Sequence, residues 1–509
     1  MFFRVLSREY RRRTRSLRLQ IRNGGIDGTP GDRPVSAKDV RDLLVSYGQD
    51  SASGVEPARI RNVRVAGSLD LSHLHLGYDL DLTGCEFAGD LVLTGANTGS
   101  LQLSRVRMNA LVAGNIRVRG DLVLHGARIV ERSPRKPSVA PDVKHLYRVG
   151  DQVQSAERTA DWESHAPIRL TSSHIDGDIV LTDATVDTED AWAIYAPRLQ
   201  VAGSFMASGL RSTGGIMLSE ARLENSIVLD RAQVGGVEAN IVTMRGGFFA
   251  DWGFVSTGPV QLLAMQAGNI VTFHDAELRG APVSANLTRL TASRIRLDMR
   301  TPPGGRLILR DIRTESLIDS TESWPASGDL DLEGLRYGRI GATDDVTASQ
   351  RVEWLTRDVN AGSSSFEQLA AHYQTAGDER SARAVRLARE RYLVRRHRMP
   401  RRLWGWTQDV LFGYGFAPTR ALLWLAALVG GGALWFSRHS VRPVHALEHP
   451  SLDPLLYSLD LVVPIVDLGQ EGAWDPTGAN KVVAMTLVIA GWLLATAVVA
   501  GARRLLNRP

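Results

Sequence analysis

Apolar residues recur along this chain in pairs separated by one residue, and the pairs return every five or six positions. The first run of such pairs extends from Val63 to Ala127. An α-helix repeats at about 3.6 residues and a strand alternates at two, so neither element explains the spacing. One short strand and one corner occupy about five residues, and four such sides close a coil of about 20 to 22 residues. The pattern therefore predicts a β-solenoid, in which each side points one or two apolar residues into the core.

The predicted fold is mainly β: a right-handed quadrilateral β-helix of the pentapeptide-repeat type over residues 61–345. Residues 131–167 interrupt it, because this segment is polar, contains four prolines and lacks repeating pairs; it is expected to be an excursion loop. Gly-Asp followed by an apolar pair recurs within the repeats. Glycine suits a corner, and the aspartate can accept hydrogen bonds from exposed backbone N–H groups. These glycines are Gly89, Gly120, Gly177 and Gly328.

Shorter segments flank the predicted solenoid. Residues 1–35 form a basic arm with eight arginines between Arg4 and Arg22, which is either disordered or in contact with anionic lipid headgroups. Residues 36–60 contain a short helix and a linker, and this helix is expected to cover the open end of the stack. Residues 346–402 predict a helical hairpin, similar to a single tetratricopeptide pair, that leads into an arginine-rich collar.

The C-terminal segment, 403–509, has the composition of a membrane anchor. Ten arginines and one acid in 380–402 precede a run of aromatic residues, an order typical of a membrane interface. Apolar stretches predict transmembrane helices at about 417–437 and 482–502, joined by the loop 438–481. Arginines precede the first span and follow the second, which predicts an inner (cell) membrane protein with both termini in the cytoplasm. The expected interface residues are Arg395, Arg396, Arg398, Arg401, Arg402, Trp404, Trp406, Arg503 and Arg504.

The loop between the spans contains a second apolar segment, 452–470, which carries two aspartates. One interpretation is a re-entrant segment of an oligomeric channel, because non-helical backbone enters a bilayer only where protein or a water-filled cavity surrounds it. The other interpretation is an external amphipathic helix whose carboxylates are solvated. The candidate pore residues are Asp460, Asp467, Gly469 and Gln470.

Few residues indicate other chemistry. His445 to His449 match an inverted zinc-peptidase spelling, but Pro450 follows at once and the loop is too short for a catalytic domain, so the match is attributed to chance. Cys85 lies on the apolar repeat and is expected to be buried, while His73 and His75 are expected on the surface. The sequence predicts no catalytic, cofactor-binding or metal-binding residue and no nucleic-acid reading module.

Several motifs together resemble a known group of proteins. They are the Gly-x-Leu-x-Leu repeats, the F-E-Q-L-A-x-x-Y-x-x-x-G-D-E-R-x-A-R block at 366–383, Gly413-Tyr414-Gly415 and Val466-Asp467-Leu468-Gly469-Gln470. The resemblance is to large actinobacterial membrane proteins that combine a pentapeptide-like β-helix with two C-terminal spans. That family is often labelled "membrane-associated oxidoreductase", and its layout is similar to pentapeptide-repeat proteins with ion-channel-like helices. Val466 to Gly469 stand where a potassium channel has T-V-G-Y-G.

Three functions are therefore expected in order. The first is a non-enzymatic integral membrane protein whose cytoplasmic β-helix is a binding, assembly or sensing surface. The second is an oligomeric ion-channel-like pore lined by 452–470. The third is an oxidoreductase, as the family label implies. The expected partners are a bilayer with anionic headgroups, further copies of the chain and a cytoplasmic protein, whereas nucleic acid is not expected.

Overall fold

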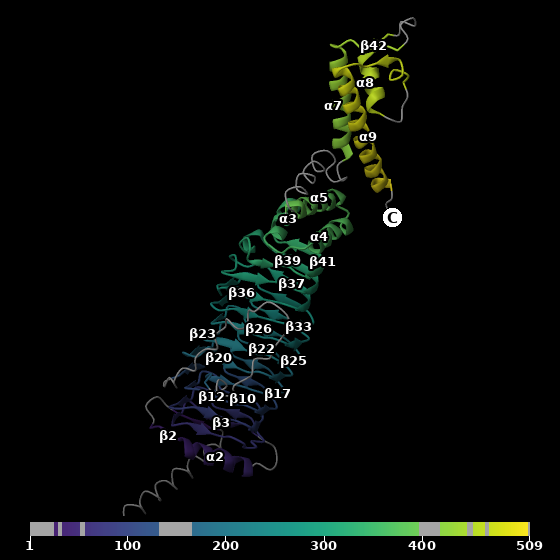
Figure 1. Ribbon diagram of the computed structural model, residues 1–509. Coiled ribbons are helices and arrows are strands. Elements are labelled where there is room, and N and C mark those ends of the chain that lie inside the picture. Colours follow the sequence, from purple (N-terminus) through teal and green to yellow (C-terminus); the bar gives the residue numbers. More distant parts are fainter. Residues whose placement is uncertain are drawn as a thin grey trace, which may run out of the picture. The chain divides into compact units, whose positions relative to one another are not determined.

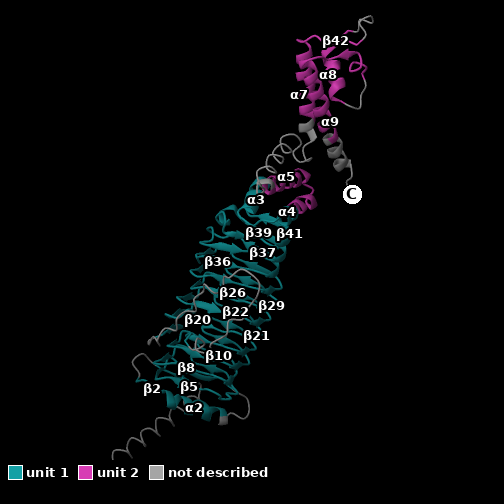
Figure 2. Cartoon of the chain, viewed as in Figure 1, with its two compact units in different colours: residues 1–368 teal, residues 369–509 magenta. Residues whose placement is uncertain are grey.

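The computed structural model (Figure 1) describes most of the chain in two compact units, which Figure 2 colours separately. Unit 1 comprises residues 1–368 and unit 2 comprises residues 369–509. The described residues are 25–28, 33–50, 56–131, 165–395, 418–444, 451–463 and 468–506.

Unit 1 is a β-solenoid of about 11 turns (Figure 1), which confirms that the apolar repeat encodes stacked β-coils. Its short strands stack in parallel in four rows, and each row forms one face. Faces are named here by their first and last strands. In chain order, one turn visits the β5–β40 face, the β9–β33 face, the β6–β34 face and the β2–β35 face. The β5–β40 and β6–β34 faces are therefore opposite, and so are the other two.

The strands of each face are as follows. The β5–β40 face contains β5 (Leu69–Asp70), β8 (Leu91–Val92), β12 (Leu111–Val112), β16 (Ile168–Arg169), β20 (Trp192–Tyr195), β24 (Gly215–Met217), β28 (Val237–Glu238), β32 (Val260–Gln261), β36 (Val283–Asn286), β38 (Arg306–Ile308) and β40 (Leu330–Asp331). The β9–β33 face contains β9 (Asn97–Thr98), β13 (Arg117–Val118), β17 (His174–Ile175), β21 (Gln200–Val201), β25 (Arg222–Leu223), β29 (Thr243–Met244) and β33 (Gln266–Ala267). The β6–β34 face contains β6 (Leu80–Asp81), β10 (Leu101–Gln102), β14 (Leu122–Val123), β18 (Ile179–Val180), β22 (Phe205–Met206), β26 (Ile227–Val228), β30 (Phe248–Phe249) and β34 (Ile270–Thr272), and β1 (Ile26–Asp27) and β3 (Ala58–Arg61) extend it at its start. The β2–β35 face contains β2 (Val35–Ser36), β4 (Arg64–Ala66), β7 (Glu86–Phe87), β11 (Arg107–Met108), β15 (Arg128–Val130), β19 (Thr185–Asp187), β23 (Arg211–Ser212), β27 (Gln233–Val234), β31 (Val255–Ser256) and β35 (Glu277–Leu278).

The first residue of each predicted apolar pair points into the solenoid. Leu101 pairs in register with Leu80 in the coil before it and with Leu122 in the coil after it, and all three are almost completely buried. Phenylalanines take over this position further along, as at Phe205 and Phe248. Each coil therefore stacks its apolar side chains on those of its neighbours, and the core is continuous along the axis.

Glycine provides only some of the corners that were predicted for it. Fifteen non-glycine residues in the described part of the chain have positive φ, as at Asn62 and Asp183 (54° and 56°), and they share two corners of the coil with glycines such as Gly126 and Gly209. The glycine of the Gly-Asp motif has another reason. A Cβ on Gly177 would overlap Oδ1 of Asp121 in the preceding coil, so glycine is needed for close approach. As expected, that Asp121 oxygen accepts a hydrogen bond from a backbone N–H, the one of Asp178.

The last coils are no longer four-sided. β33 and β34 both pair with β37 (Thr291–Leu297), so two faces merge into one broad face. β39 (Arg313–Asp319) and β41 (Arg336–Ala342) continue it as strands of seven residues each. The apolar pairs of the sequence predicted short sides here as well, because the pattern does not show whether a corner or a straight strand separates two pairs.

Helices cover both ends of the stack. At the start, α2 (Ala37–Asp50), the helix predicted there from the sequence, buries Val40, Leu43 and Leu44. At the other end the short η3 (Thr321–Ser323) and α3 (Ala348–Thr356) follow the merged face, and Arg351 of α3 forms a buried ion pair with Asp319 of β39. α4 (Ser363–Thr375) and α5 (Glu379–Arg395) come next, where the helical hairpin was predicted.

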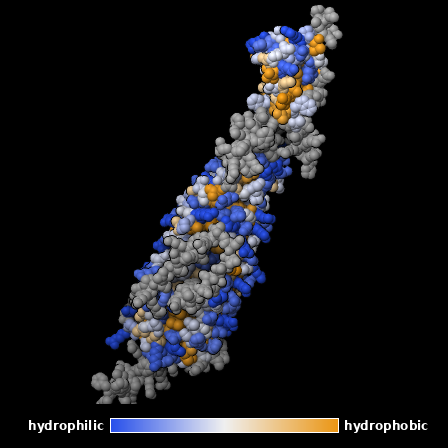
Figure 3. Space-filling model, in the orientation of Figure 1, coloured by the Kyte–Doolittle hydropathy of each residue, from blue (hydrophilic) through white to orange (hydrophobic). Residues whose placement is uncertain are grey.

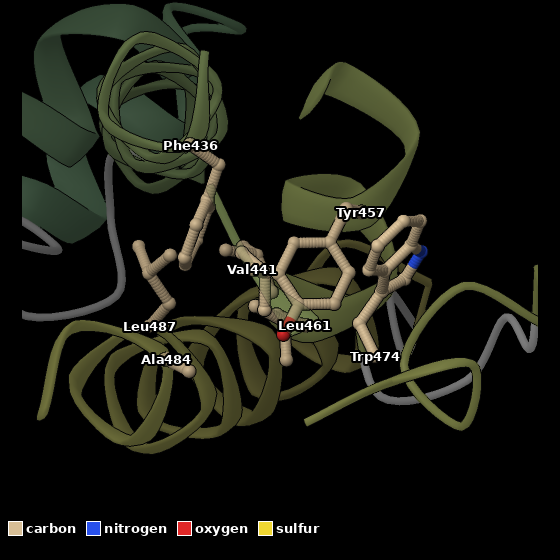
Figure 4. Close-up of a cluster of buried hydrophobic side chains, with 8 residues drawn as sticks. Phe436, Val441, Tyr457, Leu461, Trp474, Ala484 and Leu487 are labelled. Carbon is tan, nitrogen blue, oxygen red and sulfur yellow. The ribbon is translucent and has the colours of Figure 1, made fainter. Parts of the chain in front are cut away.

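The C-terminal part of unit 2 contains two long helices, α7 (Pro418–Phe436) and α9 (Ala479–Leu506), and a short one, α8 (Pro454–Val462). The two-residue strands β42 (Arg442–Pro443) and β43 (Trp474–Asp475) pair antiparallel. The three helices share one apolar core (Figure 4). Its buried members are Phe436, Val441, Tyr457, Leu461, Val462, Trp474, Ala484 and Leu487.

Candidate functional surfaces

The short helix α8 is held between the two long helices at points where glycine removes the side chain. A Cβ on Gly432 of α7 would lie 2.8 Å from Oγ of Ser458, and a Cβ on Gly491 of α9 would overlap the carbonyl oxygen of Val462. Asp453 caps the start of α8 by accepting hydrogen bonds from the N–H groups of Leu455 and Leu456. The first part of the segment 452–470 therefore forms a capped helix, Pro454–Val462, that packs between α7 and α9.

Asp460, one of the four candidate pore residues, lies on the buried side of α8. Its carboxylate accepts hydrogen bonds from the backbone N–H groups of Leu468, Gln470 and Glu471, each at 2.8 Å. Its side chain is 5% exposed, so these contacts replace solvent. The carboxylate thus fastens the chain that returns after α8, a role that sequence reasoning missed because the donors are backbone groups.

The remaining predicted site residues are only partly placed. Gly469 has a φ of 69°, which suits the turn after α8, and Oε1 of Gln470 is buried without a hydrogen-bond partner. Asp467 lies outside the described residues, as do Arg396, Arg398, Arg401, Arg402, Trp404 and Trp406. Arg395 ends α5, and Arg503 and Arg504 lie in α9, but their side chains are outside the described part. The histidine motif at 445–449 is outside it as well.

α9 is apolar on two opposite sides. Ala484, Leu487 and Leu494 are buried against the neighbouring helices. The other side exposes Val482, Met485, Ile489 and Trp492, each between 56% and 66%. By length and composition, one helix in the described chain could cross a membrane, with its apolar window at Ala479–Thr496; the apolar part of α7, Leu422–Phe436, is shorter. Figure 3 shows hydrophobic side chains gathered along these helices.

The outer surface of the solenoid carries an apolar stripe on the β6–β34 face. In five successive strands the core residue is followed by an outward, half-buried apolar residue, and these five are in register. Neighbouring strands are about 4.8 Å apart, so the stripe is about 19 Å long. The polar residues Gln102 and Thr272 take the same outward position in the coils before and after the stripe. The outer stripe consists of Val123, Val180, Met206, Val228 and Phe249.

The two adjoining faces lack such a stripe over the same coils. On the β9–β33 face the matching outward residues are Arg117, His174, Gln200, Arg222 and Thr243. Two further apolar residues are exposed at corners of one coil, Ile241 at 62% and Trp252 at 61%, and both have positive φ. A β-branched or bulky residue is strained in that backbone conformation, and apart from an edge-on contact of the Trp252 ring with His274 most of both side chains faces solvent, so these positions are candidates for contact with a partner.

Other clusters in the described residues have structural roles. His274 Nδ1 lies 2.8 Å from Asp298, which also pairs with Arg296, and the backbone N–H of His274 donates to Asp251. Like the contact of Asp121 at another corner, these contacts link one coil to the next. No group of three or more metal-ligating side chains was found among the described residues. Cys85 is fully buried, as predicted, and burial raises the pKa of its thiol to about 12.

Comparison with known proteins adds no identification: no family model, curated protein or solved structure matches this chain.

Proposed function

We propose that the chain is an integral membrane protein whose cytoplasmic β-solenoid is a binding surface for another protein. α7 and α9 are its two spans in the inner (cell) membrane, and both termini lie in the cytoplasm. The two apolar sides of α9 support this proposal. A helix of a water-soluble protein has one apolar side, which is buried, and one polar side, which faces water. A transmembrane helix can be apolar on both sides, because one contacts protein and the other contacts lipid. Arginines flanking the helices support the orientation.

Membrane insertion and orientation are tested with the full chain expressed in bacteria. We expect the protein to remain in the pellet after alkaline carbonate extraction. Replacing Ile489 and Trp492 of α9 with lysine places two charges at positions expected to face lipid. Inserting a lysine near the centre of a transmembrane helix costs about 2.5–3.5 kcal/mol. The double variant is therefore expected to release protein into the supernatant. Reporters fused at either terminus are expected to act in the cytoplasm, and a reporter inserted after Arg442 outside it. Two termini on different sides would contradict the two-span arrangement.

The outer stripe is the single observation that carries the binding function. An apolar column flanked by polar faces has the dimensions of one partner helix, since about 19 Å corresponds to about 13 residues of α-helix. Apolar anchors in a groove or on a ridge are the common way in which proteins bind an amphipathic helix. The adjacent Trp252 adds an exposed aromatic anchor, a residue type enriched at binding hot spots.

A photo-crosslinking amino acid at Met206 tests this binding surface in living cells. We expect a discrete crosslinked product from Met206, and none from Gln200, which lies in the same coil on the polar β9–β33 face. Phe249→Asp in the stripe is expected to abolish the Met206 product without changing the amount of protein in the membrane. Equal crosslinking from both positions, or a product insensitive to Phe249→Asp, would refute the stripe as the binding surface.

A second candidate function is an oligomeric ion-channel-like pore, and the glycine-lined seat of α8 between α7 and α9 favours it. A short helix between two spans, followed by a turn, is the layout of a two-span channel protomer, which needs several copies around one pore. Asp467 and Gln470 would then lie near the pore. Purified protein in planar bilayers is expected to conduct, and Asp467→Asn to change its ion preference. A monomer in native membranes, or a silent bilayer, would exclude this function.

A further inference from the structure

Arginines gather on one face of the solenoid, the β9–β33 face and the merged face that continues it. They occupy outward positions on the strands or directly after them, from the coil of Arg117 to the coil of Arg336. Eight steps between coils correspond to about 38 Å along the axis. The arginines of this basic face are Arg117, Arg119, Arg222, Arg245, Arg294, Arg313, Arg336 and Arg339.

Acidic residues at the equivalent positions are fewer than the arginines, and two of the three form ion pairs within this face. Asp176 pairs with His174 at 2.9 Å, and Glu224 pairs with Arg245 at 2.9 Å. Glu315 in β39 is the third acid. Within the described part of the chain, seven of the eight arginines have no ion pair, all except Arg245.

The arginines also lie where folding alone disfavours them. Arg313 and Arg336 are direct neighbours in the register of β39 and β41, and like charges opposite each other on paired strands destabilise a sheet. Arg294 of β37 and Arg339 of β41 both pair in register with Ser316 of β39, one on each side of it. Such an arrangement is expected where an anion outside the protein lies between the guanidinium groups, since guanidinium matches phosphate oxygens in pairs.

We propose that this basic face binds the phosphate headgroups of anionic phospholipids, so that the solenoid lies against the membrane in which α9 is anchored. The inference rests on the proposed membrane anchorage, which keeps headgroups at a high local concentration around the solenoid. A broad face with charges in rows fits a planar anionic surface, and each arginine near such a surface contributes measurably to binding. Nucleic acid is disfavoured, because the charges follow a flat sheet instead of a groove and no reading module accompanies them.

The test uses the full chain reconstituted in vesicles and one added cysteine, because Cys85 is buried and unreactive. A fluorophore is attached at Thr243→Cys on the basic face or at Gln233→Cys on the opposite β2–β35 face; both residues are exposed. A quencher on the lipid headgroup reports contact. Vesicles contain phosphatidylcholine alone or with added phosphatidylglycerol. We expect quenching at residue 243 to exceed that at residue 233, to rise with phosphatidylglycerol and to fall in concentrated salt.

Charge-removal variants make the result specific. Arg313→Gln with Arg336→Gln is expected to lower the ratio of docked to undocked solenoid about 30-fold. Arg128→Gln with Arg211→Gln removes the same charge from the opposite face and is expected to leave it unchanged. Equal quenching at both faces, displacement by inorganic phosphate alone, or tighter binding of a DNA duplex than of phosphatidylglycerol vesicles would overturn the inference. Failure of the proposed anchorage is separate, because the protein would then not float with vesicles of phosphatidylcholine alone, on which the basic face has no anionic lipid to bind.

Discussion

The carboxylate of Asp460 accepts three backbone hydrogen bonds in a buried position, so even a small change of this side chain is expected to affect stability. Asparagine would keep one acceptor oxygen and point an NH₂ group at a backbone N–H. Because hydrogen bonds to a charged group contribute about 1.5–3 kcal/mol each, we expect Asp460→Asn to lower the free energy of unfolding by about 3 kcal/mol. The measurement is thermal unfolding of the detergent-solubilised protein.

Asp453→Asn is the matched control for that change. Asp453 caps α8, and asparagine is as good an N-cap as aspartate, so the free energy of unfolding is expected to stay within about 0.5 kcal/mol of that of the unaltered protein. Equal losses at both positions would indicate that loss of charge, and not loss of the three backbone contacts, determines stability.

Two glutamates of the solenoid are expected to give opposite pH dependences. Burial raises the pKa of Glu238, against hydrogen bonds from Ser219 and Asn240. A hydrogen bond from Arg279 lowers the pKa of Glu277. The ordinary pKa of a glutamate is about 4.3. As pH rises above this value, Glu238 is expected to lower the stability of the fold, because the unfolded chain ionises more readily than the folded one. Glu277 is expected to stabilise the fold above this pH, and that stabilisation is lost in acid.

Unfolding midpoints in urea, measured between acid and neutral pH, check these signs. Relative to the unaltered protein, Glu238→Gln is expected to be more stable at neutral pH, and this advantage is expected to vanish in acid. Glu277→Gln is expected to be less stable at neutral pH and equal in acid. A neutral-pH loss in Glu238→Gln would show that its hydrogen bonds outweigh its burial.

At the scale of elements, the seat of α8 depends on two glycines in the long helices. Adding a methyl group at Gly491 would overlap the carbonyl oxygen of Val462, so the helices must separate. We expect Gly491→Ala to destabilise the helical unit by about 1–3 kcal/mol, as overpacking of a core does, although alanine is the better helix former. The measurement is the temperature at which α7, α8 and α9 lose their packing in detergent.

Gly431 provides the control for this prediction, because a Cβ there meets no atom within 4 Å. Gly431→Ala is expected to be neutral or to raise stability by up to about 1 kcal/mol. Stabilisation by both substitutions would mean that α8 does not lie between the helices in the membrane.

The elements also show what a periodic sequence can predict. The apolar pairs predicted short stacked strands correctly, as at Leu80, Leu101 and Leu122, because stacking requires a similar core residue in every coil. They did not predict the long strand β37, since a straight strand and a corner can separate two pairs by the same number of residues. They also missed corner residues such as Trp252, whose backbone is fixed by neighbouring coils and not by its own preference.

At the scale of the whole molecule, the candidate surfaces were beyond the sequence for a different reason. The outward residues Val123 and Phe249 are separated by more than a hundred positions, and the excursion between Glu131 and His165 interrupts the count. Only the register aligns them into one stripe. The basic face likewise emerges from single arginines, such as Arg222 and Arg313, that have no pattern within one coil.

The solenoid as a whole depends on its ends, and the C-terminal end is closed by a buried ion pair. Arg351 is 3% exposed and donates to both oxygens of Asp319, at 2.7 and 2.9 Å. Its guanidinium also lies 5.4 Å from the ring centres of Trp324 and Trp354. Removing the arginine would leave Asp319 charged and buried, which costs about 3–5 kcal/mol.

Because each coil touches only its neighbours, Arg351→Met is expected to loosen the end of the stack and not its middle. Amide hydrogen exchange should accelerate in β39 and β41 by about a hundredfold or more, while β14 to β26 stay protected. The double variant Arg351→Met with Asp319→Leu removes the unpaired charge and is expected to restore most of the protection. Uniform acceleration along all coils would mean that the solenoid unfolds as one cooperative unit, which would contradict the expectation that loss of the end coils leaves the middle coils intact.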